Sequence, residues 1–555
     1  MAELSRVEKH IRRKSLLRNR RGQFEQLWDD LSRVLLTRRQ GFVTNTEDGD
    51  SRTDDIFDGT GIQAARSLAN TVGSMIRPEG QSFARVRAED HNLERDDENA
   101  FWLADTSERF NRALKNPRSR FRQATGECDM DLVVFGTGIL YSGLSNSKTN
   151  LIFQSVSLKD AVVMYDDEGN PAALYRSRRL MVWQLVEMFG RGKLSKKVQE
   201  LIEQDKMDDR IEVLQVIAKR EGTVFEEPLL AKNMPFEHLW IEVATKHLIS
   251  EDGFMELPVV APRWDTSSGE DYGRSPGMIS LPDVNTLQAM GETILVAGQR
   301  VADPPMMAPN DGIMSEVNTF PGGLSYYDVE TASQMGGNPF FPLISGANLP
   351  VTREMQMDTR NQVLNAFFKN ILNLPMNGPQ MTATEIIQRK DEFIREVGPV
   401  FGRFESDYNR PIAERTFNLL LRAGAFLPVP EGLAGTRINF EFEMPVTKIR
   451  KQVEAAAAKQ WAVEMLELSN VKPEAADLVN VDELGRFAHD AAGIPHEILN
   501  GRQAVEALRE QRAAAMQQQQ QAEMLQQGAG VAEQLAGAAN KVSSAGGNSP
   551  QAAEG

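Results

Sequence analysis

Six histidines and one cysteine are the side chains of this chain best suited to bind a metal ion or to attack a substrate. The histidines are His10, His91, His238, His247, His489 and His496. No two of them have the H-E-x-x-H spacing that places two metal ligands on one helix face. Cys128 lies in a helix-like stretch, FRQATGECDMDLVVF, and a lone cysteine is usually a small buried hydrophobe. We therefore expect no metal site and no cysteine nucleophile.

Glycine-rich segments lack the spacing that phosphate binding needs. The chain has no G-x-x-x-x-G-K-[ST] loop, so no phosphate cradle of that type is expected. Gly136-Thr137-Gly138 lacks the third glycine of a dinucleotide site, where Tyr141 stands instead. We expect these glycines to form a turn between a buried strand, DLVVF, and the next strand, ILYSG.

Clusters of carboxylates are the remaining candidates for catalysis. They are Asp54, Asp55 and Asp58, and a second group at 96–98. Runs of acids are usually solvated loops, and no matching base or metal ligand stands beside these. The sequence thus predicts no catalytic residues, no cofactor and no enzymatic activity.

The length, the net charge and the single cysteine of the chain exclude several classes of protein. The 555 residues, 41% of them hydrophobic, suffice for roughly three or four domains of about 150 residues. With 62 Lys+Arg against 78 Asp+Glu, the net charge is −16, which makes the chain a poor general clamp for nucleic acid phosphates. The polar start and the absence of a run near ~20 apolar residues predict no signal peptide and no membrane partner. We expect a chain that is assembled in the cytosol.

The first half of the sequence has the pattern of a mixed α/β fold. Residues 1–40 carry 11 Lys+Arg against 5 acids and predict an amphipathic helix whose basic face is either solvated or meets an acidic partner. Further helices are expected from Thr60 to about 77 and at roughly 96–115. Short apolar runs at 130–185 and 211–262 predict antiparallel strands, interrupted by one helix at roughly 181–205.

The second half alternates long helices with a loop-rich insertion. Residues 282–302 predict a helix whose seam includes Gly291 and Gly298, small enough for a neighbouring helix to approach closely. Seven prolines and six glycines in 303–350 exclude a long helix there, and a second helix is expected at 352–373. Then follow a short loop, a long kinked helix from about 383 to 423, a strand after 437, and helices at about 447–468, 481–490 and 501–513. The Gln-, Ala- and Gly-rich end is expected to be disordered.

Five strings, in this order, resemble the portal (head-to-tail connector) proteins of short-tailed, T7-like bacteriophages. They are DDIFDGTGIQAARSLANTVGSMIRP, FGTGILY, GEDYGRSPGMISLPDVNTL with VADPP, MTATEIIQRKDEF and RPIAERTFNLLLRAGAFLP. The resemblance covers most of residues 10–510, with Ser82-Phe83 as a local departure. It implies an α+β portal fold that assembles into a ring, expected to be a homododecamer.

The resemblance also implies a division of the chain. Residues 1–280 would form the wing, 281–302 and 351–372 the two stem helices, 303–350 the clip, 373–381 the tunnel loop, 382–446 a long kinked helix returning to the wing, 447–510 the crown, and 511–555 a disordered tail. Residues 301–352 contain five acids and no Lys or Arg, a net charge of −5 that would repel DNA phosphates in a ring.

Candidate binding residues follow from that division. The DNA-facing tunnel loop would be Leu374, Pro375, Met376, Asn377, Gly378, Pro379 and Gln380. Weak phosphate contacts are expected from Arg360, Lys369, Arg389 and Lys390, with surface or intersubunit pairing of these cations as the alternative. Docking of partners to the clip is expected from Asp311, Glu316, Phe320, Tyr326, Tyr327, Asp328 and Glu330.

The function implied by the resemblance is a passive one. The ring would occupy one vertex of the capsid in the virion, nucleate head assembly, and let double-stranded DNA pass independently of its sequence. Its partners would be other copies of the chain, DNA, the terminase motor, major capsid and scaffolding proteins, a tail adaptor and internal head proteins. The alternatives are a scaffolding or tail structural protein and, less favoured, a terminase subunit, which the absence of a phosphate loop argues against.

Overall fold

The computed structural model describes residues 5–302 apart from 38–40, 44–52, 79, 91, 146–148, 222–229 and 231–232. It also describes 306–307, 330, 333, 341–342, 349–369, and 402–520 apart from 444, 471 and 495–497. The chain divides into two compact units. Unit 1 comprises Met1–Ala84, Glu108–Phe426 and Phe442–Thr447, and unit 2 comprises Arg85–Ser107, Leu427–Glu441 and Lys448–Gly555.

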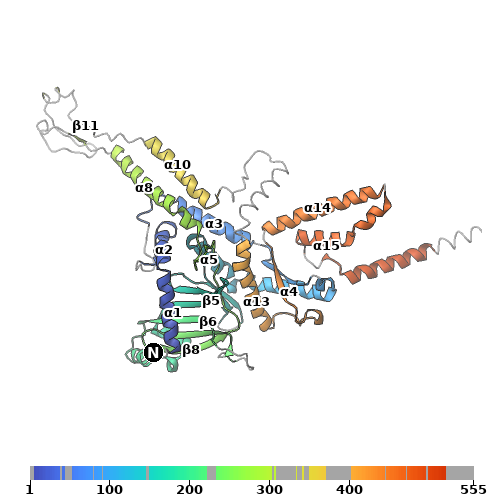
Figure 1. Cartoon of the computed structure of the whole chain (residues 1–555), viewed down its shortest axis with the longest axis horizontal. Helices are drawn as coiled ribbons and strands as arrows, with labels where there is room; N and C mark the ends of the chain where they lie inside the picture. The colour runs from blue at the N-terminus through green and yellow to red at the C-terminus, as the bar shows by residue number, and fades with distance from the viewer. Residues whose placement is uncertain are drawn as a thin grey trace, which may run out of the picture. The chain divides into compact units, whose positions relative to one another are not determined.

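A five-stranded antiparallel sheet lies in unit 1 (Figure 1). Its strands, in spatial order, are β4 (Ala161–Tyr165), β5 (Pro171–Met181), β6 (Arg210–Lys219), β7 (Phe236–Glu242) and β8 (His247–Phe254). Successive side chains of a strand point to opposite faces. Leu214 therefore packs with Tyr175 on one face, and Val213 packs with Trp240 on the other. The antiparallel pairing predicted for this half is confirmed.

Helices cover both faces of this sheet. Apolar residues of α1 (Arg6–Arg20), such as Ile11, pack against the first face. Residues of α6 (Val182–Phe189) and α7 (Lys196–Glu203), such as Leu185 and Val198, form the core on the second face. The single helix predicted at 181–205 is therefore wrong. Gly190, with a left-handed φ of 79°, ends α6, and a 3₁₀ turn, Arg191–Lys193, separates the two helices.

The basic face of α1 finds its acidic partner within the same chain. His10 lies 2.7 Å from the Glu237 carboxylate, and the Arg6 guanidinium bridges Glu237 and Glu251. In the opposite direction, the Lys246 ammonium reaches Glu8 at 2.7 Å. The sequence left two alternatives for this basic face, contact with solvent or with an acidic partner. In the structure, carboxylates of β7 and β8 in the same chain pair with Arg6 and His10.

The apolar interior of unit 1 continues into α2 (Gly22–Leu35), α3 (Thr60–Ile76), α5 (Phe121–Phe135) and a three-stranded sheet. The order of that sheet is β3 (Leu151–Ser155), β2 (Leu140–Leu144) and β9 (Val259–Val260). The segment DLVVF, expected as a strand, is the last turn of α5. Gly136 ends the helix with φ 78°, and a Cβ there would lie 2.2 Å from the Gly273 carbonyl oxygen. The close approach of that carbonyl requires glycine at this turn.

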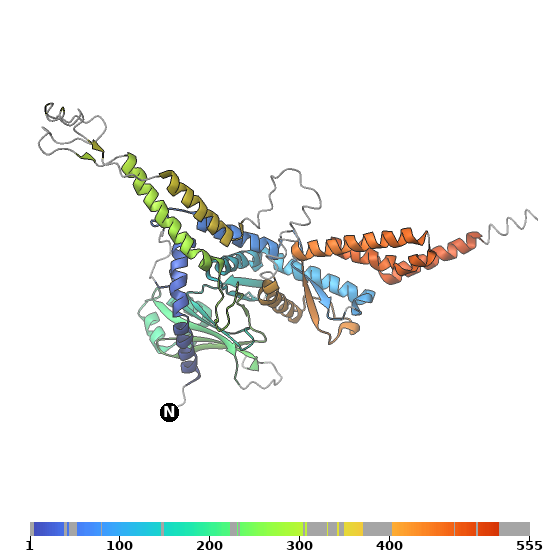
Figure 2. The same cartoon turned by 45° about the horizontal axis from the view of Figure 1, so that its top comes forward.

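Two long helices project side by side from unit 1 in both views (Figures 1 and 2). They are α8 (Pro276–Ala302) and α10 (Leu349–Ala366), here called the projecting helices. At their far end, β10 (Met306–Met307) pairs antiparallel with β11 (Phe341–Pro342). The second helix ends before the expected residue 372, because Phe368 has a left-handed φ of 56°. Residues 370–401, including most of the predicted long helix and its capping box, lie outside the described residues.

The described part of the predicted long helix contains a π-helical turn, Glu405–Asn409, followed by α13 (Arg410–Arg422). This wide turn brings Tyr408 into the interior, where its ring lies 4.8 Å below the Arg77 guanidinium. Arg77 in turn pairs with Asp129 of α5. Gly424, predicted to end the helix, is left-handed at φ 68°.

Unit 2 is built mainly from helices around a two-stranded ribbon. The ribbon pairs β1 (Ala84–Ala88) with β12 (Ile438–Phe442). The helices are α4 (Asp97–Lys115) as far as Ser107, α14 (Pro445–Ser469) from Lys448 onward, α15 (Val481–Ala492) and residues 502–520. The strand after 437 and the helix at 96–115 are confirmed. Residues 511–520, expected to be disordered, instead continue the last helix.

No helix among the described residues combines the length and the apolar character needed to cross a membrane.

Candidate functional site at the base of the projecting helices

Apolar side chains join the two projecting helices where they leave unit 1. Val284 and Leu287 of α8 and Val363 of α10 are buried, as is Phe367 just after α10. Toward the far end this burial is lost, and Leu295 and Val296 of α8 and Met355 and Met357 of α10 are exposed. The helix pair is thus packed at its base and incompletely covered farther out.

Residues 57–58 form a polar strap across α8. The side-chain amide of Gln288 accepts hydrogen bonds from the backbone N–H groups of Phe57 (2.7 Å) and Asp58 (2.9 Å). Its NH2 group donates to the Asp58 carbonyl at 2.8 Å. One glutamine therefore satisfies three backbone groups of an irregular segment, which fixes the segment against the helix.

Asp58 extends the strap to α10. Its carboxylate accepts from the Thr60 N–H at 2.8 Å, at the start of α3, and from Arg360 Nε of α10 at 2.9 Å. The Asp58 side chain is only 2% exposed, whereas that of Arg360 is 42% exposed. Burial alone would raise the pKa of Asp58, but the hydrogen bonds from Thr60 and Arg360 outweigh it and lower that pKa. The charged form is therefore the one that the site stabilises.

Two small residues let these elements approach closely. A Cβ on Gly291 would lie 2.8 Å from the Phe57 Cβ, and one on Gly61 would lie 2.9 Å from Leu35 and 3.1 Å from Val284. The sequence had suggested that Gly291 lets a neighbouring helix approach. In the structure it accommodates the strap instead. Gly298 has no atom of the described residues within 4 Å of such a Cβ, so within them it serves no close approach.

The structure describes two of the four cations that were expected to contact DNA phosphates. Arg360 pairs with Asp58 of its own chain, whereas the sequence had left surface or intersubunit pairing as the alternative to a phosphate contact. Lys369 is half-buried just beyond α10. Arg389, Lys390 and the whole loop 374–380 lie outside the described residues.

Of the expected clip residues, the structure describes only Glu330, which is exposed. The others lie outside the described residues; they are Asp311, Glu316, Phe320, Tyr326, Tyr327 and Asp328. Their role in docking stays a prediction.

Asp58 and Gln288 are the site residues that sequence reasoning missed. Asp58 was expected in a solvated acidic loop, and this is wrong, because the residue is 5% exposed. One signal was available: Asp58 stands two residues before Thr60, the position from which an Asp side chain can accept from the first N–H of a helix. Nothing in the local pattern indicates Gln288, whose partners lie 230 residues away.

Neither Cys128 nor the described titratable side chains are arranged for nucleophilic attack or metal binding. Cys128 is fully buried on α5, and burial strongly raises the pKa of its thiol. Among the residues that the structure describes, no three His, Cys, Asp or Glu side chains gather in a group that could hold a metal ion. The polar contacts of the strap connect residues 57–58 with α8, α10 and the start of α3. They therefore hold these helices in place.

Comparison with known proteins places nearly the whole chain in one family. Residues 8–499 match the family described as bacteriophage head to tail connecting protein. A probable portal protein of Bordetella phage BPP-1 is 26% identical over 93% of both chains, and the portal protein of Salmonella phage epsilon15 is 25% identical over the same shares. A solved chain from the virion of a native gene transfer agent particle covers 80% of this chain and 92% of its own length. Its TM-score with this chain is 0.32 and its sequence identity is 11%.

The match over nearly all of the sequence agrees with the absence of catalytic motifs and with the resemblance drawn from the five strings. The chain therefore belongs to the bacteriophage head to tail connecting proteins, which are structural, non-enzymatic components of the virion at the capsid vertex.

Proposed function

We propose that copies of this chain form a ring, with twelve subunits, through which double-stranded DNA enters and leaves the phage head. Membership of the connector family supports this proposal together with one structural observation. Two long helices, packed at their base and joined far out by a short ribbon, project from a mixed α/β body. Side-by-side copies of such a pair would form the wall of a channel.

Exposed apolar residues on the projecting helices support assembly. Leu295 and Val296 of α8 and Met355 and Met357 of α10 remain open to water in the single chain. Apolar groups at such density on two neighbouring helices are typical of a surface that another chain covers. In the proposal, adjacent copies cover them and the ring acquires an obligate interface, on the order of 2,000 Å² or more.

The finer division of the chain follows the same proposal. The wing is 1–280, the stem is α8 with α10, and the clip lies between the two stem helices. Residues 382–446 return to the wing, and 447–510 form the crown.

The clip would dock the terminase motor and later the tail adaptor, while the wing and crown would meet capsid, scaffolding and internal head proteins. The net charge of −5 in 301–352 would keep DNA from binding tightly, so that it can slide.

Contacts with DNA are assigned to the loop 374–380 and, as weak phosphate contacts, to Lys369, Arg389 and Lys390. Arg360 is given a different role, because its guanidinium is engaged by the buried Asp58. It positions the stem helix α10 on the strap. The loop has few groups suited to reading base edges, which fits passage of any sequence.

The test replaces residues 374–380 and follows both assembly and packaging. In one variant the seven residues are deleted, and in a matched control they become a Gly/Ser segment of the same length. Negative-stain images should show rings for the wild type and both variants, while packaged DNA is retained poorly by the deletion. Wild-type chains that stay monomeric at high concentration would overturn the ring. Normal packaging by both variants would remove the loop from the mechanism.

A further inference from the structure

Two arginines stand side by side on one face of the five-stranded sheet in unit 1. Arg176 and Arg178 are two residues apart on β5, so both side chains lie on the same face. It is the face on which Val213 packs with Trp240, because Val213 of β6 is directly opposite Arg178. Both arginines are half-buried, and they lie where the edge strand β4 begins, since Ala161 pairs with Arg176. We call these two arginines the β5 pair.

The positive charges of the β5 pair are poorly compensated. Burial, and then the neighbouring charge of Arg178, lowers the pKa of Arg176 to about 10. Burial lowers the pKa of Arg178 as well. The carboxylate that acts on both is that of Asp160, which is exposed. Among the residues that the structure describes, neither arginine forms an ion pair with it, so the pair retains a local excess of positive charge.

The neighbouring side chains on this face are uncharged. Directly across from Arg176, the Gln215 side-chain amide lies 2.9 Å from Nε2 of His238. Burial lowers the pKa of His238 to about 4, so its ring is neutral near pH 7. The guanidinium carbon of Arg178 lies 5.8 Å from the centre of the Trp240 ring. This cation–π contact holds Arg178 in place without neutralising its charge.

The outer ends of both guanidinium groups are available to a ligand. Nε of Arg176 is hidden from solvent and has no hydrogen-bond partner, so packing holds the inner part of this side chain. The Nη groups of Arg176 and the nitrogens of Arg178 are not hidden in this way, and no hydrogen bond within the described residues uses them. Two adjacent guanidinium groups therefore present free N–H donors on one face of the sheet.

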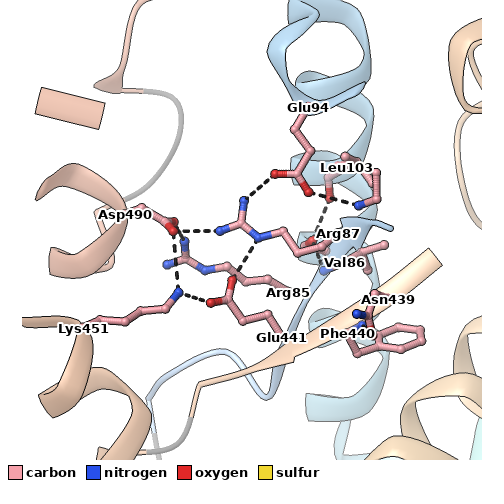
Figure 3. A network of polar contacts seen from close by, with 12 residues as sticks. Arg85, Val86, Arg87, Glu94, Leu103, Asn439, Phe440, Glu441, Lys451 and Asp490 are labelled. Carbon is pink, nitrogen blue, oxygen red and sulfur yellow. Dashed lines mark hydrogen bonds and ion pairs between the residues drawn. The ribbon is translucent and has the colours of Figure 1, made fainter. Parts of the chain in front are cut away.

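Arg87 of β1 in unit 2 shows the contrasting, compensated arrangement (Figure 3). It contacts Glu94 (3.2 Å), Glu441 of β12 (2.9 Å) and Asp490 of α15 (2.8 Å). Lys451 of α14 pairs with Glu441 and lies 3.7 Å from Asp490. Three carboxylates thus serve this network, whereas no carboxylate of the described residues pairs with the β5 pair. The charges on β5 are suited to an anion that the chain itself does not supply.

We propose that the β5 pair binds a phosphate group, either free phosphate or a phosphate of a DNA backbone. Each guanidinium offers parallel N–H donors to an oxyanion. The two oxygens of a carboxylate are filled by one arginine, whereas a phosphate group has enough oxygens and charge for two. This site uses none of the residues assigned to DNA in the channel, and it does not depend on ring formation.

Isothermal titration calorimetry of the full chain with inorganic phosphate tests the site. The wild type should bind one phosphate per chain, and Arg176→Gln or Arg178→Gln should weaken binding by about tenfold or more. Arg179→Gln is the matched control, because Arg179 is exposed and lies on the opposite face of the same strand. It should bind like the wild type. No saturable binding by the wild type, or an equal loss in all three variants, would overturn the proposal.

A change that keeps both arginines provides an independent test. Asp160→Asn removes the negative charge that acts on the β5 pair, so it should tighten phosphate binding several-fold. Unchanged or weaker binding would contradict the site. In thermal unfolding at constant ionic strength, phosphate should raise the melting temperature of the wild type more than that of Arg176→Gln. An equal rise in the two chains would also contradict it.

Competition experiments distinguish the sources of the phosphate group. A short DNA duplex that displaces inorganic phosphate, and does so less well as salt is added, would identify backbone phosphates as the ligand. A duplex that leaves phosphate binding unchanged would identify a small phosphate ligand. Succinate is the control anion, because it carries two carboxylates and no phosphate. Succinate that binds the β5 pair as tightly as phosphate would overturn the assignment to phosphate.

Discussion

The pair Arg77–Asp129 in unit 1 and the network around Arg87 in unit 2 use the same kinds of side chain in very different surroundings. The side chains of Arg77 and Asp129 are 9% and 2% exposed. Those of Arg87 and Asp490 are 27% and 34% exposed. Water and salt therefore reach the second network and not the first.

This difference in exposure shows that the charged side chains have different structural roles in the two units. In unit 1 the buried pair joins α3, α5 and the π-helical turn, so it specifies one packing of the interior and penalises any loss of a partner. In unit 2 the half-exposed network orients α14 and α15, while large apolar side chains stay outside. Around the buried pair the interior of unit 1 is closed, whereas in unit 2 large apolar side chains such as Trp461 remain exposed in the single chain.

The largest expected effect comes from breaking the buried pair. Asp129→Ala leaves the Arg77 guanidinium buried without its carboxylate, and we expect the free energy of unfolding to fall by about 3–5 kcal/mol. Urea unfolding of the monomer, followed by tryptophan fluorescence, measures this. The double variant Arg77→Met/Asp129→Leu should regain most of the loss, and a single variant as stable as the wild type would contradict the comparison.

An intermediate effect is expected at the strap. Asp58→Ala removes the acceptor for Thr60 and Arg360, and we expect a loss of about 1–3 kcal/mol. The ion pair itself contributes little of this, because Arg360 is 42% exposed. Gln288→Ala should act similarly, since it removes the partners of two backbone N–H groups.

The contribution of Asp58 to the free energy of unfolding should also depend on pH. Because its pKa is lowered in the folded chain, the charge of Asp58 stabilises the fold fully above the unfolded pKa, about 3.9. That contribution is lost as pH falls through the folded pKa. The difference in unfolding free energy between wild type and Asp58→Asn should therefore narrow below about pH 4 and stay constant from pH 5 to 7. A difference that grows on acidification would contradict the assigned direction.

A smaller effect is expected in the half-exposed network. Arg87→Ala should cost about 1 kcal/mol or less, and that cost should shrink further in about 1 M salt, where charges are screened within about 3 Å. Hydrogen exchange of the β1–β12 backbone, compared at low and high salt, reports on the network locally. The cost of Asp129→Ala should not respond to salt in this way.

The smallest effect is expected on the surface of the sheet. Lys246 is 58% exposed and its partner Glu8 is 32% exposed, so Lys246→Ala should change stability by less than about 0.5 kcal/mol. Thermal unfolding suffices as the measurement. A loss as large as that of Arg87→Ala would mean that exposure does not rank these ion pairs.

Sequence patterns predicted those elements whose apolar period is local and uninterrupted. The helices around 96–115 and 447–468 and the strand NFEFEMPV are examples. The prediction of one helix at 181–205 failed because the apolar period continues across Gly190, although the backbone turns there. DLVVF was mistaken for a strand because a short buried run has the same composition in either structure.

At the candidate site, the sequence by itself determined the family, the absence of catalytic motifs and the two long helices around an acidic, proline-rich insertion. These properties follow from residue types and spacings within one segment. Only the tertiary structure decided that Asp58 is buried, that Arg360 is its partner, and that Trp461 of α14 is exposed. Each of these depends on contacts between residues far apart in the chain, or on which side of a helix the rest of the fold covers, and local spacing contains neither.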